Sequence, residues 1–149
     1  NIPVYFEERV FERFGKKLFI AHGDGLGPGD HGFKFLKKIF RNKFCQFLFG
    51  SLHPTWGMGL ANYFSRKSRE KTGFADEQFL GEDKEWLFIF SKEKLTQEHF
   101  DYFIFGHRHY PLLQKIAQNS YYLNLGDWIR NFTYAEMDEN GMQLKKWTN

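Results

Sequence analysis

The sequence predicts an α/β fold in which strands near both ends of the chain form a sheet and the residues between them form a helical insertion. Apolar, strand-like runs occupy residues 10–21 and most of the chain after residue 101, whereas the intervening apolar residues have helical spacing. The chain has 149 residues, of which 20% are aromatic and 26% are charged. This composition suffices for one hydrophobic core, and no linker or low-complexity tract divides the chain, so we predict one domain.

Residues 10–21, VFERFGKKLFIA, predict two short strands about a turn at Gly15–Lys16, and the second strand is apolar enough to be buried in a sheet. The following residues, HGDGLGPGD at 22–30, contain four glycines and a proline, which end both strand and helix. Asp30 is placed to cap a helix that starts there.

The next part of the chain predicts the helical insertion, from about residue 31 to about residue 95. A helix, or two, is expected from Gly32 to Gly50, with apolar residues at helical spacing: Phe33, Leu36, Phe40, Phe44 and Phe47. A shorter helix with a basic end follows at 58–73, and a third covers the first part of 82–100, where acidic residues favour a helix start.

The last third of the chain predicts strands. Residues 101–109, DYFIFGHRH, predict a buried strand, and two hairpins follow, one about Gln118–Asn119 and one about the Asn140–Gly141 turn signal.

Charge and cysteine content limit the classes of partner. A formal net charge of +3 does not indicate nucleic acid, but it is compatible with a phosphate-bearing substrate or an anionic membrane surface. The single cysteine, Cys45, cannot form an internal disulfide and favours a reducing, cytoplasmic compartment. No apolar run approaches the ~20 residues of a spanning helix.

Histidines follow two of the predicted strands. His107 and His109 are two residues apart, so they face the same side just beyond a strand end, and Gly106 allows close approach of a metal or substrate. For an isolated His-x-His pair, we favour the alternative of ordinary polar residues closing a strand. His22 and Gly23 at the end of another apolar strand change this weighting and predict a metal site at the carboxyl edge of the sheet.

The chemistry of this predicted site stays open in two respects. Neutral imidazoles suit Mn, Fe, Zn, Ni or Co, so three histidines do not select a metal. Asp24 either orients an imidazole or forms an Asx-turn in the glycine-rich loop.

The motifs AHGDGLGPGD, FGHRHYP and LNLGDWI together resemble those of the calcineurin-like metallophosphoesterases, over essentially the whole chain. Within that superfamily the sequence is most similar to the UDP-2,3-diacylglucosamine diphosphatases of lipid A biosynthesis, which cleave a UDP-sugar lipid to lipid X and UMP. The resemblance implies a metal-dependent hydrolase with a four-layer α/β/β/α sandwich and a helical cap insertion. It also implies a peripheral position on the cytoplasmic face of the membrane.

Site residues carry over from this resemblance one by one. His22 and His107 match ligands of one ion of a binuclear site, usually Mn²⁺, and His109 matches a ligand of the other. Asp30 matches a cap-side contact to the sugar, and Ser65 with Arg69 lies where cap residues contact the nucleotide-sugar.

The family's earlier motifs, Asp-x-His, Gly-Asp and Gly-Asn-His-Asp, are absent from these residues. We therefore expect residues 1–149 to be the carboxyl-terminal portion of a longer enzyme whose missing amino-terminal portion supplies the remaining ligands. Two ions need a bridging carboxylate, so little activity is expected from this chain alone, and we assign no general acid within it.

Several alternatives remain. The chain could act on another phosphodiester, or it could be a binding module that has kept the fold without the chemistry.

The phenylalanines of the insertion suit either an acyl-chain groove or a helix wedged against the core. The basic residues Arg66, Lys67, Arg69 and Lys71 suit either substrate steering or a solvated face. Trp128 suits either the metal site or the core, and His31, His53 and His99 are predicted to be structural.

Overall fold

The computed structural model describes residues 3–28, 31–72 and 78–148, without the side chains of residues 31, 33 and 68–72. It contains strands and helices in the predicted order. The strands are β1 (Arg9–Arg13), β2 (Lys16–Ile20), β3 (Tyr102–Phe105), β4 (Pro111–Ala117), β5 (Ser120–Leu125), β6 (Thr133–Asp138) and β7 (Gly141–Lys146). The helices are α1 (His31–Arg41), α2 (Lys43–Gly50), α3 (Pro54–Thr72) and α4 (Trp86–Leu95).

Five strands form the main sheet, in the order β1-β2-β3-β5-β4. The three central strands β2, β3 and β5 are parallel, and β1 and β4 are antiparallel at the edges. Ile20 of β2 pairs with Ile104 of β3, so the chain segments that follow both strands leave from the same edge of the sheet. The predicted α/β class, with strands from both ends of the chain in one sheet, is confirmed.

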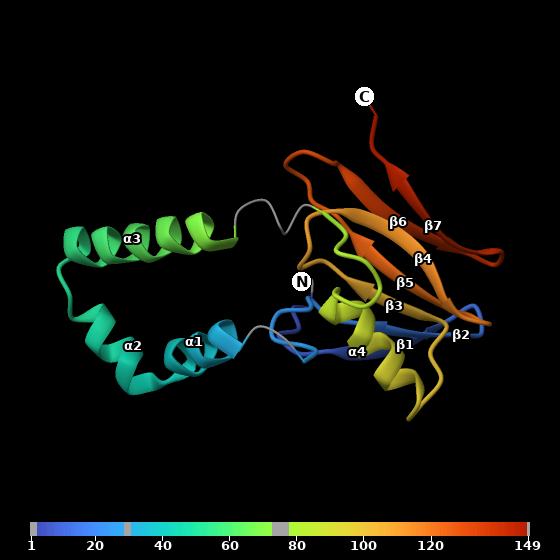
Figure 1. Ribbon diagram of the computed structural model, residues 1–149, viewed down its shortest axis with the longest axis horizontal. Helices are drawn as coiled ribbons and strands as arrows, with labels where there is room; N and C mark the ends of the chain where they lie inside the picture. The colour runs from blue at the N-terminus through green and yellow to red at the C-terminus, as the bar shows by residue number, and fades with distance from the viewer. Residues whose placement is uncertain (1–2, 29–30, 73–77, 149) are drawn as a thin grey trace.

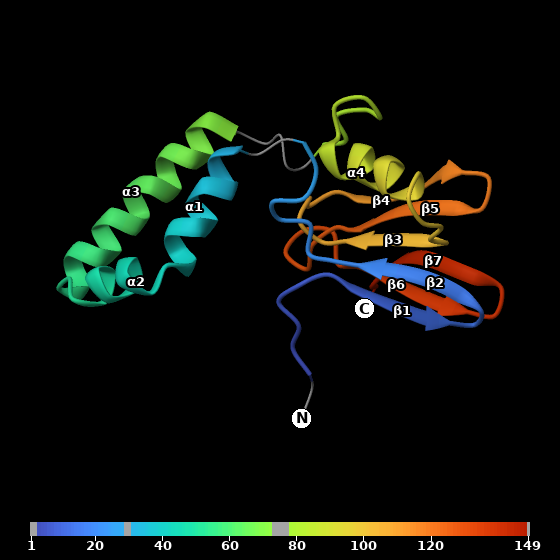
Figure 2. The same cartoon turned by 90° about the horizontal axis from the view of Figure 1, so that it is seen from below.

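Each face of the main sheet is covered by a different element. On one face, Leu87 and Phe88 of α4 pack against phenylalanines that include Phe19 and Phe103. On the other face, the β6–β7 hairpin packs against a cluster built on Ile104 and its neighbours. Around the main sheet the structure therefore forms three layers, namely α4, the sheet and the hairpin (Figures 1 and 2).

Helices α1, α2 and α3 stand away from the sheet (Figures 1 and 2). The prediction placed α4 in the same insertion, but α4 packs on the sheet because Leu87 and Phe88 are fully buried there. Phe44 and Phe47 of α2 are 68% and 69% exposed, so the described structure does not wedge this helix between cap and core. Asn42 separates α1 from α2, because its side-chain oxygen accepts the backbone N–H groups of Phe44 and Cys45 and caps α2.

Two of the three predicted turns are displaced by one residue. The first hairpin turns at Phe14–Gly15, both with positive φ, because Arg13 pairs with Lys16. The last turns at Glu139–Asn140, where Asp138 Oδ1 accepts the N–H groups of Asn140 and Gly141. The turn at Gln118–Asn119 is confirmed.

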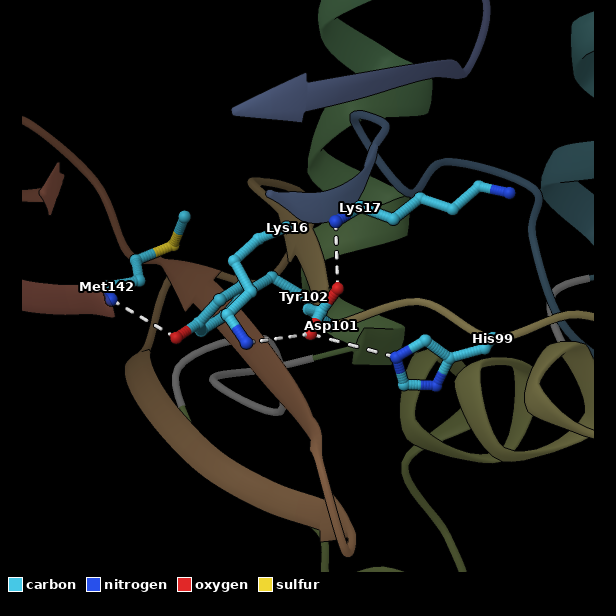
Figure 3. Close-up of polar contacts among 6 residues, drawn as sticks. All are labelled: Lys16, Lys17, His99, Asp101, Tyr102 and Met142. Atoms are coloured by element: carbon cyan, nitrogen blue, oxygen red, sulfur yellow. Dashed lines mark hydrogen bonds and ion pairs between the residues drawn. The ribbon is translucent and has the colours of Figure 1, made fainter. Parts of the chain in front are cut away.

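Asp101 ties the strands together at the edge where β3 begins (Figure 3). Its Oδ2 accepts the backbone N–H of Lys17 at 2.8 Å, and its Oδ1 lies 3.3 Å from Lys16 Nζ and 3.7 Å from His99 Nε2. Its backbone N–H donates to Lys17 and its carbonyl accepts from Tyr121. Asp101 thus fixes the start of β3 between β2 and β5.

Candidate metal centre

His22 and His107 meet at the carboxyl edge of the main sheet. Beyond the paired strands, the His22 carbonyl accepts the backbone N–H groups of Gly106 at 3.1 Å and of His107 at 2.8 Å. These bonds extend the β2–β3 register past the strand ends. The two histidine loops are therefore held beside each other by the backbone.

The two imidazoles have a geometry that suits one metal ion. His107 Nδ1 and His22 Nε2 lie 3.5 Å apart, and the ring centroids are 5.3 Å apart with an interplanar angle of 84°. Two nitrogens bound at about 2.0–2.1 Å to a tetrahedral ion are about 3.4 Å apart. His22 is exposed and His107 half-buried, so an ion could reach both.

Gly23 makes this close approach possible. Its φ is +107°, and an added Cβ would lie 2.9 Å from Leu87 Cδ1 and 3.1 Å from His107 Cβ. Gly106, the glycine that the sequence analysis selected, has more room. The nearest atom to a Cβ added there would be His22 Nδ1, at 3.8 Å. The required glycine is thus the one beside His22.

His109 is exposed and lines a neighbouring groove together with Gly126, Asp127 and Trp128, which follow β5. Within the described residues, no three His, Cys, Asp or Glu side chains are close enough to hold one ion together. The structure therefore brings two of the three predicted ligands together and places the third on the groove. Trp128 is 58% exposed, so the alternative of core packing is wrong.

A polar network that the sequence did not reveal holds the His109 loop. Asn131 Nδ2 donates to the His109 carbonyl at 2.7 Å and to Asp127 Oδ2 at 3.0 Å. Asp127 Oδ1 accepts the backbone N–H groups of Arg130 and Ile129. These N–H donors, that of Arg130 foremost, lower the pKa of Asp127 to about 2, so it is ionised at neutral pH. The signal for this network in the sequence is the aspartate that opens the loop, because Asp favours capping of the backbone that follows it.

Asp24 makes an ion pair that the sequence did not predict. Its Oδ2 lies 2.7 Å from Lys37 Nζ of α1, while Lys34 Nζ donates to the carbonyl of Gly27. Partial burial raises the pKa of Asp24, but Lys37 outweighs it and the pKa is lowered. The glycine-rich loop thus joins the histidine site to the first helix of the insertion.

The predicted cap residues either lie away from the carboxyl edge of the sheet or fall outside the residues that the structure describes. Asp30 is outside the described residues, and so is the side chain of Arg69. Ser65 lies on α3, in the part of the chain that stands away from the sheet (Figure 1). Their predicted contacts with a nucleotide-sugar stay predictions.

Comparisons with known proteins agree with the family resemblance of the motifs. No protein-family model matches the chain. It is 33% identical over 155 residues to UDP-2,3-diacylglucosamine hydrolase of Porphyromonas gingivalis (strain ATCC BAA-308 / W83), covering 95% of this chain and 59% of that protein. The chain is a homologue of these hydrolases. Proteins of the same name from Histophilus somni (strain 2336) and Serratia proteamaculans (strain 568) are 27% and 22% identical, covering 96% and 93% of this chain.

The homologues confirm the resemblance that the motifs predicted. The chain spans 57% to 59% of the length of these curated relatives. The UDP-2,3-diacylglucosamine hydrolase relatives are matched through the histidine loops as well as the helical insertion, because the alignments include more than nine tenths of this chain.

Proposed function

We propose that this chain is the carboxyl-terminal portion of a UDP-2,3-diacylglucosamine hydrolase with a calcineurin-like, four-layer metallophosphoesterase fold. The reaction would add one water across the pyrophosphate bridge of the UDP-sugar lipid, leaving one phosphate on UMP and one on lipid X. The His22–His107 pair carries the proposal, because two imidazole nitrogens 3.5 Å apart at a sheet edge suit one metal ion. The homologues supply the substrate class.

The chain's own residues would bind and orient the metal ions. His22 and His107 would bind one Mn²⁺ through Nε2 and Nδ1, and His109 would bind a second from the adjoining loop. When bound, the ions would supply a hydroxide nucleophile and neutralise charge on the phosphoryl oxygens. Neutral imidazoles bring no negative charge, so the bridging carboxylate would come from the part of the relatives that this chain does not match. We therefore propose that residues 1–149 alone bind about one ion and hydrolyse substrate poorly.

The helical insertion would bind the lipid part of the substrate. Helices α1 to α3 expose large apolar side chains, among them Phe40, Phe44, Phe47 and Trp56. Lys38 and Arg41 in the last turn of α1 accompany them, as in interfacial helices that bind anionic lipid. This exposed apolar surface supports our proposal of peripheral attachment to the cytoplasmic face of a membrane. No helix among the described residues is long and apolar enough to cross a membrane.

Calorimetric titration of the chain with Mn²⁺ tests the metal centre. We expect binding of about one ion, and a loss of at least ~10-fold in affinity in His22→Ala and His107→Ala, since each substitution removes one ligand. His99→Ala is the matched control, because His99 is exposed and precedes β3, whereas His107 follows it. Binding that ignores His22 and His107 would contradict the proposed centre.

The proposed activity is tested in a chimera. The chain joined to the unmatched part of the Porphyromonas gingivalis relative should release UMP from UDP-2,3-diacylglucosamine, and His107→Ala in that chimera should abolish release. Cleavage of other phosphodiesters but not this substrate would favour a different phosphoesterase. Metal binding without cleavage of either would favour a binding module.

A further inference from the structure

A buried ion pair lies directly behind the histidine loop. Arg108, between His107 and His109, is 1% exposed, and Glu85 at the start of α4 is fully buried. Arg108 Nη2 lies 3.4 Å from Glu85 Oε2 and donates to the carbonyl of Gln78 at 2.9 Å. Neither residue belongs to the metal centre proposed above.

The surroundings of Arg108 hold the guanidinium in one orientation. It lies 5.0 Å from the ring centroid of Trp86 and 5.5 Å from that of Tyr110, both within range of a cation–π contact. The Tyr110 hydroxyl in turn lies 3.3 Å from that of Tyr122 in β5. A planar fork fits these partners better than the single ammonium of lysine would.

Glu85 lies immediately before the first turn of α4. It is the N-cap residue of α4, yet its side chain makes no capping hydrogen bond to the helix. Its carboxylate instead contacts Arg108 of the histidine loop. A buried ion pair is weak evidence for stability by itself, because the desolvation of both charges offsets their attraction.

Arg108 lies between His107 and His109 in the chain, so its ion pair acts on the backbone that carries both histidines. Residues 107–110 form bends beyond the end of β3, and within them His107 is half-buried, Arg108 buried and His109 exposed. Anchoring the Arg108 side chain in the interior therefore restrains the backbone that carries the histidine on either side of it. We propose that the Arg108–Glu85 ion pair is a positioning device that sets the imidazoles of His107 and His109 for metal binding.

This inference rests on the proposed metal centre, with Arg108 and Glu85 as positioning residues that touch neither metal nor substrate. Outer contacts that orient metal ligands are typically worth about 10-fold to 100-fold in metal affinity. Loss of Arg108 alone would leave Glu85 charged and buried, so a single substitution confuses orientation with unfolding. A double variant separates the two.

The test compares the chain with Arg108→Met/Glu85→Leu, Arg108→Lys and the control Leu123→Ala. The double variant replaces the pair by apolar side chains of similar size, so it should melt close to the parent temperature. It should nevertheless bind Mn²⁺ at least ~10-fold more weakly than the parent chain. Arg108→Lys keeps the charge without the planar fork, so its Mn²⁺ affinity should lie between those of the parent and the double variant. Leu123→Ala removes a buried side chain from the face covered by the β6–β7 hairpin, so it should lower the melting temperature with little change in Mn²⁺ affinity.

A second readout needs no metal. In the metal-free chain, magnetisation transfer between the ring protons of His22 and His107 should be visible, and it should weaken or vanish in the double variant. Undiminished transfer and undiminished Mn²⁺ affinity in the double variant would overturn the positioning role. Equal losses of affinity in Leu123→Ala would also overturn it, since any destabilisation would then suffice. A parent chain with the ring contact but no Mn²⁺ binding would contradict the metal centre instead, and the ring contact would then decide the positioning role.

Discussion

At the scale of single residues, the candidate site depends on the absence of a side chain at Gly23 as much as on the imidazoles of His22 and His107. Gly23 is buried between Leu87 of α4 and His107, with φ in the region that other residues rarely adopt. Any side chain at this position would push against the helix or against the proposed ligand. The glycine therefore links core packing to the site.

Gly23→Ala should consequently lower both stability and metal affinity. The added Cβ would lie 2.9 Å from Leu87 Cδ1, and the positive φ adds strain, so we expect about 1–3 kcal/mol of destabilisation. Urea denaturation measures this change, and Mn²⁺ titration should show weaker binding. Gly106→Ala is the matched control, because its nearest neighbour would be 3.8 Å away. If both variants behave alike, close packing at Gly23 is not what sets the site.

The comparison of these two glycines shows how far sequence predicts the site at this scale. The motif indicated that histidines and glycines meet, and the parallel pairing of β2 with β3 brings His22 and His107 together as expected. Which glycine is crowded depends on Leu87, a residue that lies 64 positions away from Gly23 in the chain (87 − 23). The burial of Arg108 could not be predicted either, since its partner Glu85 comes from the start of a helix that is distant in the chain.

At the scale of elements, strand and helix identities followed from periodicity, whereas their exact ends depended on side-chain hydrogen bonds. Asn42 divides the predicted 32–50 helix by capping α2, and Asp138 moves the last turn to Glu139–Asn140. Helix α4 was assigned to the insertion by its position in the chain. It packs on the sheet because Leu87 and Phe88 are buried against the side chains of β3 and its neighbours.

Asp101 gives an element-scale prediction for pH. Burial raises its pKa, but hydrogen bonds from Lys17 and Lys16 outweigh this and lower the pKa below its ordinary value of 3.8. A carboxylate with a lowered folded pKa stabilises the protein fully at neutral pH, and the contribution is lost as pH falls below 3.8 through the folded pKa. Asp101→Asn should cost about 2 kcal/mol near pH 7, measured by urea denaturation, and the difference from the parent should shrink at acid pH.

The control for Asp101 is Glu139→Gln, in the exposed β6–β7 turn. A neutral substitution on the surface should change the free energy of unfolding by less than about 0.5 kcal/mol. A pH-independent difference between Asp101→Asn and the parent would show that ionisation of Asp101 does not hold the β2–β3 start.

At the scale of the whole molecule, the described chain combines a packed sheet unit with helices α1 to α3, whose apolar side chains are largely exposed. In the sheet unit, apolar residues are buried between layers, and periodicity suffices to predict them. In α1 to α3, the same periodicity predicts an apolar surface but not what covers it. The Lys37–Asp24 ion pair joins the two parts beside the histidine site.

We expect the exposed surface of α1 to α3 to bind lipid bilayers. Phe44 and Phe47 are more than two-thirds exposed, and each would contribute about 1 kcal/mol or more on entering the interface. The chain should cosediment with phosphatidylglycerol vesicles, and Phe44→Ser/Phe47→Ser should reduce partitioning by ~10-fold or more. Added salt should weaken binding in part, because the exposed Lys38 and Arg41 in the last turn of α1 act through screened charge.

The matched control for this surface is Ile129→Ser, which removes a side chain that is 76% exposed but lies beyond β5, on the sheet unit. If the helices bind the bilayer, Ile129→Ser partitions like the parent while the α2 double variant does not. If Ile129→Ser loses as much binding, the sheet edge rather than α1 to α3 contacts the lipid, and the proposed role of the insertion is wrong. Binding that vanishes entirely at high salt would instead mean that charge alone attracts the chain, because burial of phenylalanine in a bilayer does not depend on screening.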